Sequence, residues 1–153
     1  MTEHTNHYYY SFEQEGNFSY SAEDIDQLSE YEKYQLSFHP ERPKYLDYLS
    51  LFDSVEECFS SDEFGAWLIQ THRAEITING SSIPLMSIGQ QTGPTSRYNE
   101  MLEMMKDGEK VKHWNHGMPT PASYERAIRA VDAANEEGRM IITFVDTPGA
   151  DPT

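Results

Sequence analysis

The chain has 153 residues, which is enough for one domain with its own core and leaves little room for a second. Its formal net charge of −15 opposes binding to phosphate backbones, so we expect no nucleic-acid partner. The single cysteine, Cys58, excludes an internal disulfide and a cysteine-rich zinc site. No segment approaches the roughly 20 apolar residues of a membrane helix, and the start lacks the pattern of a signal peptide. We therefore expect a cytoplasmic protein that does not associate with membranes.

Residues 1–22 show no helical or strand periodicity, and we interpret them as a flexible acidic and aromatic tail before a domain over residues 23–153. Ser21 is placed to cap a helix that continues at helical spacing and stops before Pro40. A second helical pattern runs from Tyr45 to about Cys58. The sequence therefore predicts amino-terminal helices.

The next segments are typical of strands. The alternation from Ala74 to Ile78, the dipeptide Asn79-Gly80 and the run Ser82 to Ile88 predict a hairpin, because both positions of a type I′ turn need positive φ. Gly89 to His116 is long and irregular, with a short helix expected from Arg97 to Lys106.

The carboxy-terminal part has the clearest local signals. Thr120 and Pro121 predict a helix start and Gly138 its end, with an apolar stripe facing the core. The stripe comprises Tyr124, Ala127, Ile128, Val131 and Ala134. Met140 to Val145 is a continuous apolar run that fits a strand buried on both faces. The turn Asp146 to Ala150 follows this strand, where ligands gather in α/β sheets, so it is the best-placed candidate site.

Two other kinds of site are open from the residue pattern. His113 and His116 lie three apart and would share a metal on a helix, but no third ligand has a convincing spacing, so we expect no metal. Asp146 at the strand end fits a general acid or base, although a hydrogen-bonding role in the turn is favoured.

The sequence contains the segments HPERPKYLDY (39–48), IGQQTG (88–93), GMPTPASYERA (117–127) and IITFVDTPGA (141–150). Together they resemble the α subunit of bacterial-type acetyl-CoA carboxylase carboxyltransferase. Residues 39–48 (HPERPKYLDY) are similar to the family's HPxRPxxLDYI segment. Residues 88–93 (IGQQTG) are similar to its IGHQKG. Residues 117–127 (GMPTPASYERA) with 141–150 (IITFVDTPGA) are similar to its GMPxPxGYRKA helix and its IITFIDTPGA strand and turn. The order and approximate spacing agree over most of residues 23–150.

This resemblance implies an α/β fold, a partial crotonase-like core of ββα repeats with amino-terminal helices. In the family, carboxybiotin on a carrier protein donates carboxylate to acetyl-CoA at a site between α and β subunits. We expect no cofactor held by this chain itself. The motif loops are the candidate ligand or partner contacts: Gly89, Gly93, Gly117, Met118, Pro119, Asp146, Thr147, Pro148 and Gly149.

The departures from the family remove positive charge and catalytic parts. Gln90 stands for the family's His and Thr92 for its Lys. Residues 58–61 replace its HGDR segment, residues 101–109 replace its basic loop, and Asp151 replaces a Tyr. The family's glycine-rich oxyanion turn, which follows DTPGA, is not in this sequence. We therefore expect no catalytic residue in this chain.

The sequence thus predicts a non-catalytic carboxyltransferase α-like protein that binds or regulates carboxylase subunits, in the context of malonyl-CoA and fatty acid synthesis. Its expected partner is a β or α carboxyltransferase subunit, or a second copy in a homo-oligomer. Two alternatives remain: one half of a split α subunit that is active only with a partner chain, or an independent acyl-CoA-related binding protein.

Overall fold

The computed structural model describes residues 26–36, 42–94, 103, 106–147 and 149–151. The chain forms two compact units, Met1–Arg42 and Pro43–Thr153. The predicted boundary between residues 22 and 23 lies outside the described residues and stays a prediction, as does the flexible tail.

Helix α2 (Glu30–Leu36) lies in the first unit. The continuous helix predicted from Ser21 is wrong in one respect, because the chain leaves the helix at Leu28 and Ser29 before α2 begins. Ser29 and Glu32 form a reciprocal cap: the Ser29 amide donates to Glu32 Oε2 at 2.8 Å, and the Glu32 amide donates to Ser29 Oγ at 3.3 Å. This cap competes with continuation of the preceding turn, so a new helix starts here. The predicted cap Ser21 and the stop before Pro40 lie outside the described residues.

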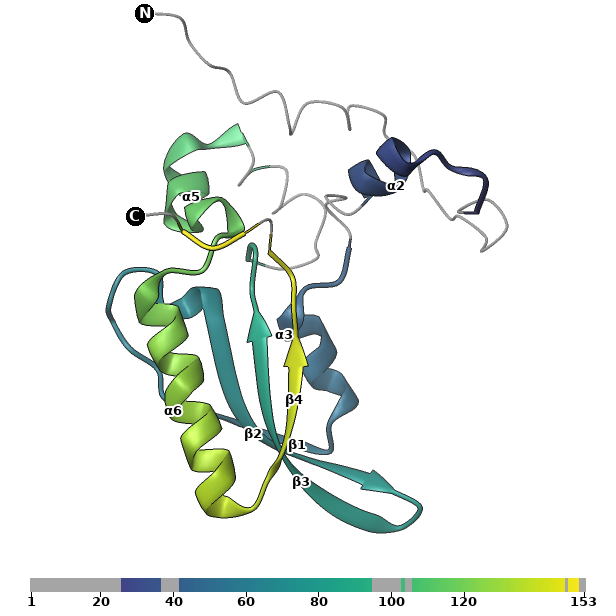
Figure 1. The fold of residues 1–153 in the computed structure, drawn as a ribbon, viewed down its shortest axis with the longest axis vertical. Helices are drawn as coiled ribbons and strands as arrows, with labels where there is room; N and C mark the ends of the chain where they lie inside the picture. Colours follow the sequence, from purple (N-terminus) through teal and green to yellow (C-terminus); the bar gives the residue numbers. More distant parts are fainter. Residues whose placement is uncertain (1–25, 37–41, 95–102, 104–105, 148, 152–153) are drawn as a thin grey trace, which may run out of the picture. The chain divides into compact units, whose positions relative to one another are not determined.

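The second unit is built on one four-stranded sheet in the order β1-β2-β3-β4 (Figure 1). Its elements are α3 (Tyr45–Tyr48), η2 (Leu49–Leu51), β1 (Ser54–Glu57), η3 (Ala66–Leu68), β2 (Ile69–Ile78), β3 (Ser81–Gln90), α5 (Gly108–His113), η4 (Asn115–Gly117), α6 (Pro121–Glu137) and β4 (Met140–Phe144). The first three strands are antiparallel, and β3 pairs with β4 in parallel through a crossover that contains α5 and α6. The mixed α/β class is confirmed.

The predicted hairpin is confirmed. Ile78 pairs with Ser81, so Asn79 and Gly80 form a two-residue turn, and both have positive φ, 52° and 78°. Strand β2 begins at Ile69, five residues before the predicted start, because its first half pairs with the end of β3.

The helix predicted from Tyr45 to Cys58 is wrong after Leu51. Phe52 is extended, and Ser54 to Glu57 form β1, paired antiparallel with β2 from Ser54 opposite Glu75 to Glu57 opposite His72. Apolar residues at helical spacing did suit a helix, but pairing with the edge of β2 satisfies the backbone of this segment instead.

Helix α6 begins and ends where the sequence predicts. Thr120 Oγ1 accepts from the Ser123 amide at 3.4 Å, Pro121 is the first helical residue, and Gly138 is left-handed with φ 64°. The irregular reading of residues 89–116 missed α5, which Asp107 caps by accepting from the amides of Glu109 and Lys110. The predicted helix from Arg97 to Lys106 falls almost entirely outside the described residues.

The face of α6 that contacts the sheet differs from the predicted apolar stripe. Buried positions on α6 are Ala122, Ser123, Arg126, Ala130 and Ala134. Of the predicted stripe only Ala134 is buried and Ala127 partly so, whereas Tyr124, Ile128 and Val131 are exposed. Small side chains let α6 approach the sheet closely, and the core forms there from Cys58, Ile69, Met86, Ile88, Ala130 and Ala134.

The sequence predicted a strand buried on both faces from Met140 to Val145. This prediction is wrong, because strand β4 is largely exposed. Met140, Ile141 and Ile142 are exposed, and Phe144 is half-buried against Tyr45 and Tyr48 of α3. The strand lies at the edge of the described sheet, so it has a neighbouring strand on one side, β3. Its apolar run therefore remains largely open.

Candidate functional site

The segments that carry the candidate residues meet at the carboxyl ends of β3 and β4. Asp146, just after β4, donates its backbone N–H to Gln90 Oε1 at 2.6 Å. Thr92, just after β3, donates its hydroxyl to Asp146 Oδ2 at 3.0 Å. Because parallel strands end at the same edge of a sheet, residues 54 apart in sequence share one hydrogen-bonding centre here.

The loop before α6 joins the same centre. Thr147 donates its hydroxyl to the Gly117 carbonyl at 2.9 Å, and Asn115 Nδ2 donates to Asp151 Oδ2 at 2.8 Å. The Asp151 amide also donates to the Pro119 carbonyl at 3.2 Å. We call the segments 90–94, 115–119 and 146–151, without Pro148, the loop cluster.

The loop cluster contains unusual backbone geometry. Asn115, His116 and Gly117 follow one another with positive φ of 44°, 53° and 77°. Such strain at non-glycine residues persists only where surrounding bonds over-determine it. Here Asn115 Nδ2 supplies two such bonds, to the Met118 carbonyl at 2.8 Å and to Asp151.

The predicted site residues divide into two groups. Gly93, Gly117, Met118, Pro119, Asp146, Thr147 and Gly149 lie in the loop cluster, and Pro148 lies outside the described residues. Gly89 lies within β3 and has a packing role, because a Cβ there would stand 1.9 Å from Tyr45 Cδ2. Gly93 is buried, and its carbonyl accepts from Gln91 Nε2 at 2.6 Å.

Asp146 is partly buried and its carboxylate is engaged by Thr92. This geometry favours the hydrogen-bonding role in the turn over the general acid or base reading. The side chains of the loop cluster bind one another and the backbone of neighbouring loops. These hydrogen bonds hold the three segments of the loop cluster in fixed positions.

Sequence reasoning missed a buried polar group on the opposite face of the sheet from α6. The Tyr45 hydroxyl lies 2.9 Å from His72 Nδ1 and donates to Ser87 Oγ at 3.0 Å, and all three residues are buried. Burial raises the pKa of Tyr45 to about 12. Burial also lowers the pKa of His72, so this imidazole is neutral near pH 7. No motif marks these residues, because the strands bring them together.

Arg126 is the other feature that the sequence did not reveal. Its side chain is almost fully buried in α6, and its guanidinium donates to Glu57 Oε1 at 2.7 Å, to the Cys58 carbonyl at 3.1 Å and to Thr71 Oγ1 at 3.2 Å. The sequence did contain one indication of this burial. Ala122, Ala130 and Ala134 lie four or eight residues from Arg126, so they share its face of the helix. Cys58 is buried at this point in the core.

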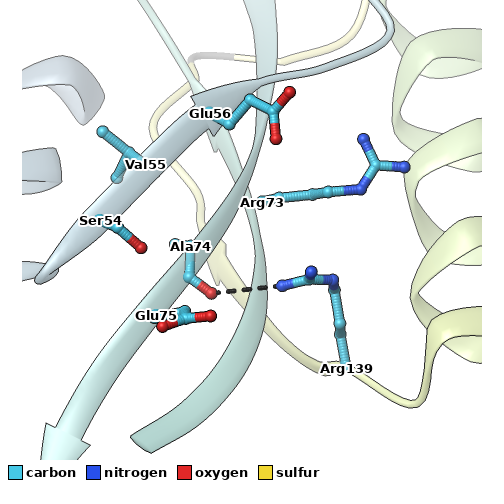
Figure 2. Close-up of a pocket in the computed structure, with 7 residues that line it drawn as sticks. All are labelled: Ser54, Val55, Glu56, Arg73, Ala74, Glu75 and Arg139. Carbon is cyan, nitrogen blue, oxygen red and sulfur yellow. Dashed lines mark hydrogen bonds between the residues drawn. The ribbon is translucent and has the colours of Figure 1, made fainter.

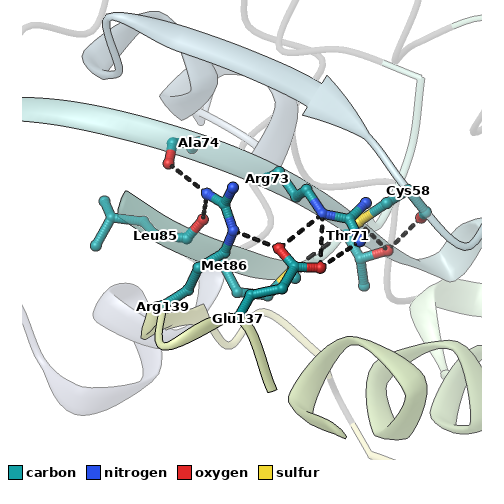
Figure 3. A network of polar contacts seen from close by, with 8 residues as sticks. All are labelled: Cys58, Thr71, Arg73, Ala74, Leu85, Met86, Glu137 and Arg139. Carbon is teal, nitrogen blue, oxygen red and sulfur yellow. Dashed lines mark hydrogen bonds and ion pairs between the residues drawn. The ribbon is translucent and has the colours of Figure 1, made fainter. Parts of the chain in front are cut away.

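A third polar group joins α6 to the sheet (Figure 3). The Glu137 carboxylate accepts from Arg73 Nη2 at 2.5 Å and from Arg139 Nε at 2.6 Å. These two guanidinium groups lower the pKa of Glu137 to about 2. Arg139 Nη1 also donates to the Ala74 and Leu85 carbonyls at 3.5 and 3.4 Å.

An open pocket of about 240 Å³ lies beside this group (Figure 2). Its lining combines the two arginines, Arg73 and Arg139, with the acidic side chains of Glu56 and Glu75. Because Glu137 already binds both guanidinium groups, the pocket offers no strong attraction to an anion. It lies on the β1 side of the sheet and contains none of the predicted site residues.

The two histidines considered for a metal take different places. His113 stacks on Trp67 with ring centroids 4.5 Å apart, and His116 lies in the strained turn. Among the residues that the structure describes, no group of three or more His, Cys, Asp and Glu side chains is arranged to hold a metal ion. Within that same part of the chain, no helix has the length and apolar character needed to cross a membrane.

Comparison with known proteins assigns a family to this arrangement. A family model described as "Acetyl co-enzyme A carboxylase carboxyltransferase-like" matches residues 13–153. The chain is 37% identical over 128 residues to the acetyl-coenzyme A carboxylase carboxyl transferase subunit alpha of Listeria welshimeri, covering 82% of this chain and 35% of the relative. The corresponding subunits of Vesicomyosocius okutanii and Chlorobium phaeovibrioides are each 36% identical, with 34% and 35% of the relative covered. The chain thus spans about a third of the length of these relatives.

Proposed function

This chain belongs to the acetyl-CoA carboxylase carboxyltransferase family, and we propose that it is a non-catalytic α-like protein that binds or regulates carboxylase subunits. The observation that carries the proposal is the loop cluster. Its polar side chains bind each other across three loops, as expected of a scaffold whose shape is presented to a partner.

The two departures at Gln90 and Thr92 support this reading directly. The family segment that they resemble has a basic group at each position, whereas here both side chains are neutral and both bind Asp146. A basic group would attract carboxylate, phosphate or an oxyanion. The two neutral side chains instead complete the hydrogen bonding of the turn. This supports a chain that keeps the structure of the loop but does not bind an anion there.

The proposal extends to features that follow from the family. We propose that the sheet and α6 correspond to part of a crotonase-like ββα core, that the protein works in the cytoplasm, and that it holds no cofactor of its own. Its partner would be a carboxyltransferase α or β subunit. The relatives are named as α subunits, which by their name work with other subunits.

The test is to mix the full chain with the α and β carboxyltransferase subunits of Listeria welshimeri. Assembly is measured by light scattering, and activity is measured as the rate of malonyl-CoA formation. We expect a complex and an altered rate of malonyl-CoA formation. Asn115→Ala, which removes two bonds of the loop cluster, should weaken the effect, whereas Thr77→Ala at the exposed end of β2 should not. Unchanged assembly and activity with the chain in excess would contradict the proposal.

A second candidate is one part of a split carboxyltransferase α subunit. The observation in its favour is coverage: 82% of this chain matches relatives of which it spans about a third. This reading expects malonyl-CoA formation from the chain plus the remaining part of an α subunit and a β subunit, with no activity when either α part is omitted. Inhibition or no activity in that mixture would favour the non-catalytic function.

A further inference from the structure

The open pocket on the β1 side of the sheet is lined by charges of both signs (Figure 2). Ser54 and Glu56 of β1 pair with Glu75 and Arg73 of β2, so these four side chains are on one face of the sheet. That face also carries α6, because Arg73 binds the last residue of the helix. Arg139 lines the pocket from the junction between α6 and β4. We call the space between these five residues the charged pocket.

The two guanidinium groups of the charged pocket keep N–H donors that the protein does not use. Arg73 donates to Glu137 through Nε and Nη2, and Arg139 donates to Glu137 through Nε and to two backbone carbonyls through Nη1. The Phe59 ring packs against Arg73 with 5.4 Å between Cζ and the ring centroid, a contact that uses the flat face of the guanidinium. Within the described part of the chain, Arg73 Nη1 and Arg139 Nη2 have no hydrogen-bond acceptor, so they are available to a ligand carboxylate.

Two carboxylates of the charged pocket are also little used inside the protein. In the residues that the structure describes, the Glu56 carboxylate has no hydrogen bond or ion pair, and the Glu75 carboxylate accepts from Ser82 Oγ alone, at 3.3 Å. Carboxylates form their strongest hydrogen bonds with ammonium and guanidinium groups. The charged pocket therefore offers two acceptors for positive groups beside one place for a negative group.

The size and the net charge of the charged pocket restrict the ligand further. Its volume of about 240 Å³ is below the roughly 300–1,000 Å³ of pockets for drug-sized ligands, so the ligand is small. Together with Glu137, two arginines and three glutamates give this region a net charge of −1. A simple anion gains little there, whereas a ligand with two positive groups and one carboxylate matches both the signs and the excess.

We propose that the charged pocket binds a free basic amino acid such as lysine or arginine. The α-carboxylate accepts from the unused N–H groups of Arg73 and Arg139. The α-ammonium group and the positive end of the ligand side chain bind Glu56 and Glu75. Exposed ion pairs are individually weak, so the affinity is in the millimolar range and falls as salt is added. This binding site goes beyond the proposed function and uses no residue of the loop cluster.

The experiment titrates the full chain, labelled with ¹⁵N, with L-lysine and follows the backbone amides by NMR. The largest shifts should map to residues 54–56 and 73–75, which line the charged pocket. Three matched ligands separate the contributions. Lysinamide lacks the carboxylate, norleucine lacks the side-chain ammonium group, and acetate lacks both positive groups. Lysinamide and norleucine should each bind several-fold more weakly than L-lysine, and acetate should not bind.

Neutral variants of the two glutamates test the acceptors directly. The double variant Glu56→Gln with Glu75→Gln should weaken L-lysine binding by roughly tenfold, because two exposed ion pairs are lost. Glu63→Gln is the matched control, since it removes a charge at an exposed position outside the charged pocket and should keep the parental affinity. Thermal unfolding of each variant checks that the fold is kept.

Four outcomes would overturn the proposal. L-lysine might show no saturable binding at millimolar concentrations, or shift amides elsewhere in the chain. The double variant might bind as tightly as the parent. Equal binding of lysinamide and L-lysine would also contradict it, because the ligand carboxylate would then play no part and the glutamates would fit a lysine side chain of a partner protein instead. None of these results bears on carboxylase assembly, so the proposed function stands or fails separately.

Discussion

The sheet has two edge strands, β1 and β4, and they expose different kinds of side chain. β1 has four residues, Ser54–Glu57, with two adjacent glutamates, and follows Asp53. β4 has five residues without a charge and continues into Val145, which is 80% exposed. Short, charged edges resist pairing with other chains, whereas uncharged β-branched edges invite it. The difference indicates that β4 is the edge more open to pairing, and the following experiments test what holds each edge in place.

The largest effect is expected at Arg126, which ties α6 to the end of β1. Arg126→Ala removes buried bonds to the Cys58 carbonyl and to Thr71 and leaves a cavity, so the free energy of unfolding should fall by about 3 kcal/mol. Urea unfolding followed by circular dichroism measures it. Glu57→Gln, which changes the exposed partner, should cost less than about 1 kcal/mol. Equal losses for the two variants would mean that the ion pair, and not the buried bonds, holds β1.

The next effect tests the β4 side. Gly89→Ala would place a Cβ inside the ring of Tyr45, which packs against Phe144 of β4, and we expect a loss of about 1–3 kcal/mol in the free energy of unfolding. Gly108→Ala, with open space around the new Cβ, is the control. If Gly89→Ala is tolerated as well as the control, Tyr45 is not the residue that seats β4 against α3.

A smaller effect is expected at His72, which lies in β2 between the two edges. Because burial lowers the pKa of His72, the unfolded chain binds its proton more readily, and stability rises with pH. The contribution is complete above the unfolded pKa of about 6.5 and is lost as pH falls through the lower folded value. Unfolding midpoints from pH 8 to 5 should therefore decline less steeply in His72→Gln than in the parent. His113→Gln, at an exposed position, should keep the parental slope.

The smallest effect concerns Glu137, whose contacts reach the two inner strands, β2 and β3, through Arg73 and Arg139. Its folded pKa of about 2 lies below its unfolded value, so its contribution is present above about pH 4.3 and is lost as pH falls toward 2. Glu137→Gln should lower the unfolding midpoint at pH 7 and converge with the parent at pH 2. Glu136→Gln, at the exposed neighbouring position, should match the parent at both pH values.

The candidate site was predictable as a set of segments but not as a set of bonds. The resemblance placed Gly117, Asp146 and Thr147 in the family's motif loops, and the structure brings these loops together. It gave no indication that Gln90 and Thr92 would both bind Asp146, or that Asn115 would bind Asp151. Such bonds depend on where separate strands end, which is a property of strand pairing and not of a motif.

What the sequence determined by itself is local: the Asn79-Gly80 turn, and the start and end of α6 at Thr120, Pro121 and Gly138. Each is set by backbone preferences within a few residues, so short segments suffice to predict it. Only the tertiary structure decided that residues 54–57 form a strand, that α6 packs its alanines and Arg126 against the sheet, and that β4 stays exposed. These outcomes depend on which distant backbone is available for pairing and on how closely a helix can approach a sheet, and apolar spacing alone specifies neither.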